Sequence, residues 1–160
     1  MNDFTMLIKH LRDIVILTVT ALLIVPWLLF RSSPEIIPGY LSIKILSMLL
    51  FMSGLSLFSW TVYLFQKIGR GTLAPWSPKS SLITSGPYRV CRNPMICGVL
   101  LMLIGEGLWF RCDRILTWAV IFFIINTLFL ILREEPFLEK KFGDEYRSYK
   151  SRVPRWLPKI

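Results

Sequence analysis

Histidine and cysteine are scarce in this sequence of 160 residues, which holds one histidine and three cysteines. The cysteines Cys91, Cys97 and Cys112 form no CxxC pair, and His10 lies far from all three in the sequence. Zinc sites and redox-active cysteine pairs usually show such closely spaced ligands. We therefore expect no metal centre and no disulfide chemistry, and we interpret the thiols as small apolar packing residues.

Acidic residues are also few, since 10 aspartates and glutamates stand against 19 lysines and arginines, for a net charge of +9. The basic residues flank apolar blocks and do not follow one face of a helix, which argues against a nucleic-acid-binding surface. Membrane topology and attraction to anionic headgroups account for the charge instead.

Polar residues are sparse over four long stretches, and 54% of the chain is hydrophobic, with a mean hydropathy of +0.55. Crossing the hydrocarbon core of a bilayer takes roughly 20 helical residues, within a range of about 17–25. Helices satisfy every backbone polar group within their own segment. We expect a single all-α integral membrane domain over residues 1–160 with four transmembrane helices. These cover about 14–30, 43–65, 95–110 and 115–132, and a cytoplasmic tail covers 133–160.

The third apolar block is short for a span and contains Glu106, so we expect a tilted or partly sheltered helix. Acidic residues within spans usually face protein or water. Glu106 lies near the outer end of the block, between Gly105 and Gly107. We interpret it as a residue that is hydrogen-bonded at a contact between helices.

The basic residues are distributed unevenly around the four blocks. Fifteen of the 19 lie in the N-terminal segment, in the loop between the second and third blocks, or after the fourth block. The other four are Arg31, Lys44, Arg111 and Arg114. Four spans place the first three regions on one side, and the positive-inside rule puts that side, with both termini, in the cytoplasm.

Two segments on this side are candidates for function. The loop over residues 66–94 has three glycines and four prolines, so we expect it to be irregular, and loops of this length usually bind something or are disordered. The tail has apolar residues at spacings of three or four, which predicts an amphipathic helix along the membrane interface, disturbed near Pro136. Together they predict a polar cavity at the cytoplasmic end of the third and fourth spans.

Arg89 and Arg92 precede the third block, and two interpretations apply to them. They anchor the span under the positive-inside rule, or they line the cavity on a framework that Pro87 and Pro94 make rigid. Asn93 comes directly before a proline and is pushed towards an extended backbone. We expect its side-chain amide to be free to bind a ligand.

Glu134 and Glu135 stand where the fourth block meets the tail. Neighbouring residues of an α-helix point about 100° apart, so we expect at most one of them to face the cavity. That carboxylate would bind a cation or ribose hydroxyls. The alternative is a solvated pair balanced by nearby basic residues.

Residues 71–110, "GTLAPWSPKSSLITSGPYRVCRNPMICGVLLMLIGEGLWF", and 133–158, "REEPFLEKKFGDEYRSYKSRVPRWLP", carry a resemblance to a known family. The shared features are "SGPYR", an element like "RHPxYxG", a glutamate pair and "FGxEYxxYxxxVPRW". In this order they resemble the isoprenylcysteine carboxyl methyltransferase family, a broad membrane group that includes phospholipid N-methyltransferase-like proteins. The first two spans match only in character.

The resemblance implies S-adenosylmethionine as cofactor, bound between the membrane helices and the cytoplasmic C-terminal portion. A pocket with both glutamate and arginine can neutralise the sulfonium, ammonium and carboxylate of this molecule. Arg89 and Arg133 are candidates for binding the substrate, and no catalytic residue or metal ligand is assigned. The cofactor-binding positions carried over are Ser81, Leu82, Ile83, Tyr88, Arg92, Asn93, Pro94, Met95, Ile96 and Glu134.

The sequence departs from the family pattern at three places. Asn93 stands where a histidine is usual, as in some bacterial members, and it cannot titrate near neutral pH. Ile96 stands where a tyrosine is usual. The arginine that binds the substrate carboxylate, one helical turn before the acidic pair in eukaryotic enzymes, has no counterpart other than the adjacent Arg133. This weakens the case for a prenylcysteine substrate.

We therefore expect an S-adenosylmethionine-dependent methyltransferase of the bacterial inner membrane, acting on a lipophilic small molecule at the cytoplasmic face. Its expected partners are that acceptor and membrane lipid, without nucleic acid or metal. Two alternatives stay open. One is a non-enzymatic helical bundle with a decayed site, and the other is an NADPH-dependent membrane reductase of the sterol-reductase type.

Overall fold

The computed structural model describes residues 20–31, 40–68 and 82–156, and the regular structure in these ranges is helical throughout. The all-helical fold predicted from the sequence is confirmed for this part of the chain. In chain order the elements are η1 (Thr20–Ile24), α2 (Val25–Arg31), α3 (Leu41–Ile68), η2 (Gly86–Arg89), α4 (Pro94–Trp109), α5 (Asp113–Phe129), η3 (Leu130–Glu134), α6 (Glu135–Phe142) and α7 (Asp144–Arg152).

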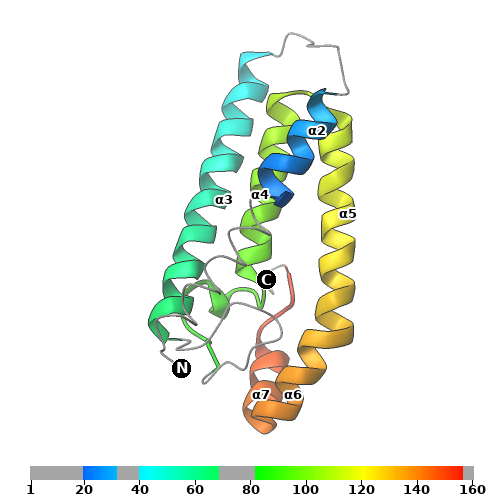
Figure 1. The fold of residues 1–160 in the computed structure, drawn as a ribbon. Helices are drawn as coiled ribbons and strands as arrows, with labels where there is room; N and C mark the ends of the chain where they lie inside the picture. Colours follow the sequence, from blue (N-terminus) through cyan, green and yellow to red (C-terminus); the bar gives the residue numbers. More distant parts are fainter. Residues whose placement is uncertain (1–19, 32–39, 69–81, 157–160) are drawn as a thin grey trace, which may run out of the picture.

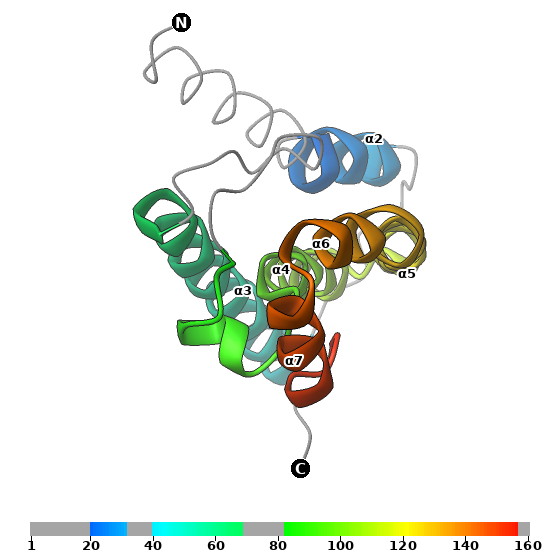
Figure 2. The same ribbon diagram turned by 90° about the horizontal axis from the view of Figure 1, so that it is seen from below.

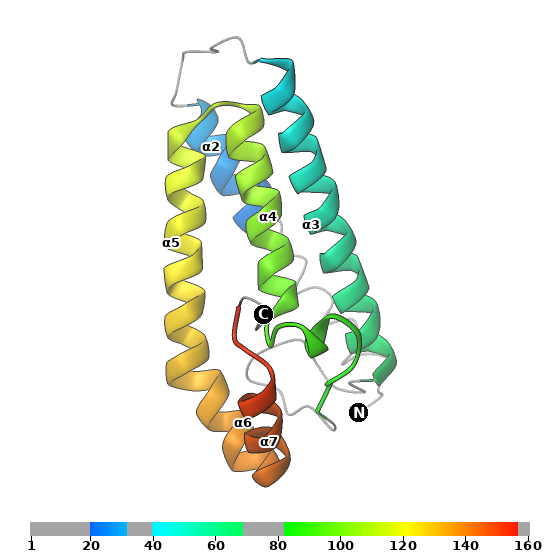
Figure 3. The ribbon, with the colours of Figure 1, turned by 180° about the vertical axis from the view of Figure 1, so that it is seen from behind.

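The helices α3, α4 and α5 stand side by side, with α4 in the middle (Figures 1 and 3). The short helix α2 lies across α4 and α5 at the end where these two helices are joined (Figure 1). At the other end, α5 continues through η3 into α6, and α7 folds back beside it below α4 (Figure 2). The η2 turn lies at this same end, so the loop and the C-terminal elements meet there.

Two helical segments, Leu41–Leu64 and Asp113–Phe142, are long and apolar enough to cross a membrane. Only 11% and 17% of their most apolar stretches are buried inside the structure, whereas the core helix of a soluble protein is mostly buried. The exposed side chains include Leu49 of α3 and Ile125 of α5. Both helices therefore present to their surroundings the apolar surface that a lipid-facing helix needs.

The other two predicted spans are represented by shorter helices. Helix α4 has 16 residues, and Thr20–Arg31 covers the first predicted span only from residue 20 onwards, since residues 14–19 lie outside the described ranges. Four transmembrane helices and cytoplasmic termini thus stay predictions. The expectation that residues 66–94 are irregular throughout is wrong at its start, because α3 continues to Ile68; residues 69–81 lie outside the described ranges.

Small residues let α3 and α4 approach each other closely. A Cβ atom at Gly54 would lie 2.6 Å from the carbonyl oxygen of Gly98, and one at Gly98 would lie 2.9 Å from that of Gly54. The helices also approach closely further along α4, where a Cβ at Gly105 would lie 2.8 Å from the carbonyl oxygen of Ser47 on α3. Close backbone approach at small residues is a main source of stability between helices in membranes.

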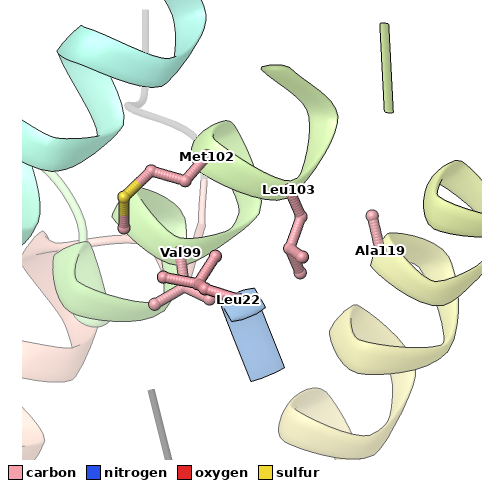
Figure 4. Close-up of a cluster of buried hydrophobic side chains, with 5 residues drawn as sticks. All are labelled: Leu22, Val99, Met102, Leu103 and Ala119. Carbon is pink, nitrogen blue, oxygen red and sulfur yellow. The ribbon is translucent and has the colours of Figure 1, made fainter. Parts of the chain in front are cut away.

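A buried cluster joins η1 to α4 and α5 (Figure 4). Leu22 packs against Val99 and Leu103 of α4 and against Ala119 of α5. The indole of Trp118 on α5 donates a hydrogen bond to the carbonyl oxygen of Ala21 at 3.1 Å, which ties the π-helical turn to the bundle. This cluster fixes the half of the molecule that lies away from the C-terminal helices.

The surroundings of Glu106 differ from the hydrogen bond between helices that we expected for it. Its Oε2 atom is buried on α4 and has no hydrogen-bond partner among the described residues. The neighbouring Gly107 lies close to α5, because a Cβ there would lie 2.5 Å from Leu116 Cδ2, so a larger residue would force the Leu116 side chain to move. The glycine therefore serves helix packing.

The contact at Gly54 predicts a large difference between two neighbouring substitutions. Gly54→Leu forces α3 away from the backbone of α4 and should lower the free energy of unfolding by at least about 1–3 kcal/mol. Ser53→Leu places the same side chain at the adjacent exposed position of α3 and should change stability little. Unfolding of both variants in detergent, followed by circular dichroism, measures the difference. Equal stability would show that α3 and α4 do not pack closely there.

Candidate functional site

The junction between α5 and α6 is a π-helical turn whose cause is Pro136. Proline lacks the backbone N–H that would bond the carbonyl of Leu132, and its ring crowds that carbonyl. The helix responds by widening, so that the N–H of Glu135 bonds to the carbonyl of Leu130, five residues earlier. Single π-helical turns of this kind occur often at functional sites.

The wide turn changes the orientation of the glutamate pair. Glu134 and Glu135 both line one hollow at this end of the molecule. The expectation that at most one of them faces the cavity is therefore wrong, because it assumed the 100° step of a regular α-helix. A π-helical turn has more residues per turn, which brings neighbouring side chains closer in direction.

The predicted single amphipathic helix after the fourth span is two helices in the structure. Gly143 separates α6 from α7 with a φ of 52°, a conformation that other residues adopt rarely. The apolar faces of both helices close on each other through Leu138, Tyr146 and Tyr149, with Val153 beyond α7. The apolar residues whose spacing predicted an interfacial helix thus also form a small core in the C-terminal portion.

The loop before α4 is held against this portion by its backbone. The hydroxyl of Tyr149 on α7 donates to the carbonyl oxygen of Tyr88 at 2.7 Å. Tyr88 belongs to the η2 turn, which starts at Gly86 with a φ of 61°. Ile83 and Tyr88 pack in turn on Leu64 of α3.

The chain after α7 closes over the same loop (Figure 3). The backbone N–H of Arg92 donates to the carbonyl of Pro154 at 2.9 Å. The side-chain amide of Asn93 donates to the carbonyl of Arg155 at a long 3.5 Å, so the expectation of a free amide is only partly met. Trp156 packs on Phe123 of α5 with ring centroids 5.0 Å apart.

These segments enclose a hollow with about 450 Å³ of empty space, part of it open to solvent. Its wall combines leucine and isoleucine side chains with three tyrosines, an arginine, an asparagine and the glutamate pair. The lining residues are Leu82, Ile83, Tyr88, Arg92, Asn93, Leu130, Glu134, Glu135, Leu138, Tyr146 and Tyr149.

Glu135 is the centre of the charged part of the wall, with its side chain 8% exposed. Its Oε1 accepts hydrogen bonds from Arg92 Nη1 at 2.9 Å and from Arg155 Nε at 2.7 Å. Its Oε2 lies 3.2 Å from Lys150 Nζ, which also pairs with Glu139 at 2.7 Å. One carboxylate thus joins the loop, α7 and the chain that follows it.

The pKa values of the basic groups around this carboxylate are shifted in the direction that favours their charged forms. Hydrogen bonds to Glu139 and Glu135 raise the pKa of Lys150, and the hydrogen bond to Glu135 raises that of Arg155. Burial raises the pKa of the tyrosines Tyr88, Tyr146 and Tyr149. At neutral pH these phenols are protonated and can donate hydrogen bonds, but they cannot take up a proton.

Six of the predicted cofactor-binding residues lie in this lining, namely Leu82, Ile83, Tyr88, Arg92, Asn93 and Glu134. Pro94, Met95 and Ile96 form the first turn of α4 beside Asn93 but do not line the hollow. Ser81 lies outside the described residues. Arg89 and Arg133, the predicted substrate-binding residues, have exposed side chains outside the lining.

The sequence favoured Glu134 over Glu135, and six other lining or pairing residues were not predicted, namely Leu130, Leu138, Tyr146, Tyr149, Lys150 and Arg155. In the sequence, Lys150 and Arg155 do not differ from the other basic residues of the predicted cytoplasmic tail, and their spacing does not indicate that they pair with Glu135. Tyr146 and Tyr149 could have been found, because they belong to the motif "FGxEYxxYxxxVPRW" and to the apolar face of the tail. Leu130 enters the site only through the π-helical turn.

The family model for phospholipid methyltransferases matches residues 42–145, more than half of the chain. The chain belongs to the phospholipid methyltransferase family. This membership confirms the resemblance to the broad membrane methyltransferase group, and it supports an enzyme. The matched range includes the loop, α4 and the glutamate pair, whereas Tyr149, Lys150 and Arg155 lie beyond it.

Two curated proteins are similar to parts of the chain. One is an uncharacterized protein of Haemophilus influenzae, 44% identical over 63 residues, which are 39% of this chain and 100% of that protein. The other is the cobalt-zinc-cadmium resistance protein CzcN of Cupriavidus metallidurans, 30% identical over 81 residues. That match covers 51% of this chain and 37% of CzcN.

The geometry around Glu135 predicts that removing its charge destabilises the fold. Glu135→Gln leaves the guanidinium of Arg92, whose side chain is 10% exposed, without its counter-charge and should cost about 3–5 kcal/mol of unfolding free energy. Glu139→Gln removes a carboxylate that is 36% exposed and should cost less than about 1 kcal/mol. Thermal unfolding in detergent compares the two. A similar small loss in both would mean that Glu135 does not hold the C-terminal portion together.

Proposed function

We propose that the protein is an S-adenosylmethionine-dependent methyltransferase that acts on a lipophilic small molecule at the cytoplasmic face of the membrane. The main support is a single hollow in which Arg92 and Asn93 of the loop meet Glu134 and Glu135 of the helix junction. Family membership supports the class of reaction. The cofactor, the site and the kind of acceptor are our own additions to this class of reaction.

The charged groups of the wall fit such a cofactor. Arg92 Nη1 is held by Glu135, while Arg92 Nε is buried and has no hydrogen-bond partner among the described residues. A guanidinium that is fixed through one nitrogen and has an unpaired N–H at another is suited to donate to a carboxylate. Glu134, in the same wall, provides an acceptor for an ammonium group or for ribose hydroxyls.

When bound, the cofactor supplies a methyl group on a positively charged sulfonium. The chain contributes position and environment. Leu82, Leu130 and Leu138 line the hollow and limit the water in it. A site with little water and with fixed dipoles suits a reaction in which charge disperses. Holding the two reacting atoms about 3–3.5 Å apart then supplies much of the rate increase.

Apart from Glu134, which the proposal gives to the cofactor, and Glu135, which is held by ion pairs, the described residues of the wall offer no general base to the acceptor. Burial keeps Tyr88 and Tyr149 protonated, and Asn93 can donate and accept hydrogen bonds but cannot take up a proton near neutral pH. An acceptor that is already an anion, such as a carboxylate or a thiolate, needs no residue to remove a proton. The proposed chemistry therefore depends on positioning more than on acid–base catalysis.

A lipophilic acceptor agrees with the location of the hollow. It lies at the end of α4 and α5, next to helices whose exposed surfaces are apolar over most of their length. An acceptor dissolved in the bilayer could reach the site along these surfaces. The charged cofactor would enter from the aqueous side, where α6 and α7 carry many of the described charged residues.

The proposal predicts binding of S-adenosylhomocysteine to the purified protein. Titration calorimetry in detergent should show heat of binding for the wild type. Glu134→Gln should weaken binding about tenfold or more, because a hydrogen bond to a charged group contributes about 1.5–3 kcal/mol. Glu145→Gln makes the same change at an exposed position of α7 and should leave the affinity unchanged.

Two results would contradict the proposal. A folded wild type that gives no heat with S-adenosylhomocysteine removes the cofactor assignment, and heat with NADPH in its place supports a reductase. Equal affinity of Glu134→Gln and the wild type removes Glu134 from the site. Transfer of a radiolabelled methyl group to a lipid extract of the source cell would then identify the acceptor.

A further inference from the structure

Cys91 and Cys97 lie on either side of the segment that brings Arg92 and Asn93 to the hollow. Their Sγ atoms are 3.9 Å apart, and both thiols are free. Cys91 is buried at the end of the loop, and Cys97 is half-buried in the first turn of α4. The sequence spacing gave no indication of this pair, because the turn at Asn93 and Pro94 is what folds the two cysteines together.

We propose that Cys91 and Cys97 are a redox-sensitive dithiol, oxidised by a hydroperoxide to a disulfide that alters the hollow. The effect on the cofactor site rests on the proposed function, whereas the formation of the bond does not. In the reaction with hydrogen peroxide both S–H bonds break and one S–S bond forms. The two sulfurs lose two electrons and two protons, and the peroxide is reduced to two molecules of water.

The surroundings of Cys91 favour it as the sulfur that reacts first. A hydrogen bond from the Cys97 thiol lowers the pKa of Cys91, and the backbone N–H of Asn93 adds to this, while burial opposes it. The thiolate is the reactive form of cysteine towards peroxides. Attack on the peroxide gives a sulfenic acid on Cys91, and the thiol of Cys97 then displaces water to form the disulfide.

The predicted location of the pair agrees with a reversible bond. The loop is expected in the cytoplasm, where glutathione and thioredoxin keep most thiols reduced and where disulfides are usually transient or redox-sensing. Cys91 is 7% exposed, so the oxidant must be a small molecule and not a protein disulfide. A hydroperoxide meets this condition.

Closing the bond has a direct effect on the wall of the hollow. A disulfide needs its sulfurs about 2.05 Å apart, so the two sulfurs must move together by about 2 Å. The residue after Cys91 is Arg92, whose backbone N–H bonds to Pro154 and whose side chain bonds to Glu135, both at 2.9 Å. Drawing Cys91 towards α4 should loosen both contacts and weaken cofactor binding.

Trypsin makes the bond easy to detect. It cleaves after Arg89, Arg92 and Arg111, so Cys91 and Cys97 end in separate peptides, residues 90–92 and 93–111. The purified protein is treated with increasing hydrogen peroxide, free thiols are blocked with N-ethylmaleimide, and the digest is analysed by mass spectrometry. The two peptides should appear linked after peroxide and separate again after dithiothreitol.

Cys112 provides the matched control, because it is a buried cysteine outside any disulfide, directly before α5 and at the other end of the molecule. Cys112→Ser should form the linked peptides as the wild type does, and Cys97→Ser should not form them. The proposal of a dithiol is overturned if Cys112 is oxidised at lower peroxide than the pair, or if the linked peptides never appear.

The effect on the hollow has two readouts. Oxidation should weaken binding of S-adenosylhomocysteine at least tenfold in the wild type and leave the double variant Cys91→Ser, Cys97→Ser unchanged. Hydrogen exchange at the Arg92 amide should become faster on oxidation, whether or not the protein binds this ligand. Linked peptides with unchanged exchange and affinity would overturn the regulatory part alone. No binding by the reduced protein would contradict the proposed function but not the disulfide.

Discussion

The carboxylate of Glu135 is the interaction on which the arrangement of the site depends. It accepts hydrogen bonds from Arg92 and Arg155 and lies 3.2 Å from Lys150, so three separate segments meet at one buried group. Buried ion pairs add little net stability, since desolvation offsets most of their attraction, but they are very costly to break. Their main effect here is on specificity, because moving the loop, α7 or the chain after it away from Glu135 breaks a contact with that carboxylate.

The position of that carboxylate follows from a single proline. Pro136 cannot continue the hydrogen-bond ladder of α5, and the helix widens over Leu130–Glu134 before α6 begins. The widening turns Glu134 and Glu135 towards the same hollow and brings Leu130 into its wall. In a regular α-helix the two side chains would point about 100° apart. The local defect in the longest apolar helix is therefore what makes an acidic site at its end.

The sequence predicted the helices well, and α3 and α4 agree with their predicted ranges to within three residues. Long apolar blocks favour helices, because a helix satisfies its backbone polar groups within its own segment. It also predicted that the loop and the tail share one cavity. The roles of Lys150 and Arg155 could not be predicted, since a cation's partner depends on how a chain folds back, here at Gly143. The proximity of Cys91 and Cys97 likewise depends on the turn before α4, which spacing alone does not describe.

Scaffold and site are held by different kinds of interaction. The helices α3 and α4 touch through their backbones at Gly54 and Gly98, a contact that allows little adjustment. The loop is instead held to the C-terminal portion by a few polar contacts, among them Tyr149 to Tyr88 and Arg92 to Pro154. Segments with few apolar contacts open at lower free energy than a packed core. A partly covered hollow must widen for a large ligand to enter, and this structure allows widening at the loop while the helices stay packed.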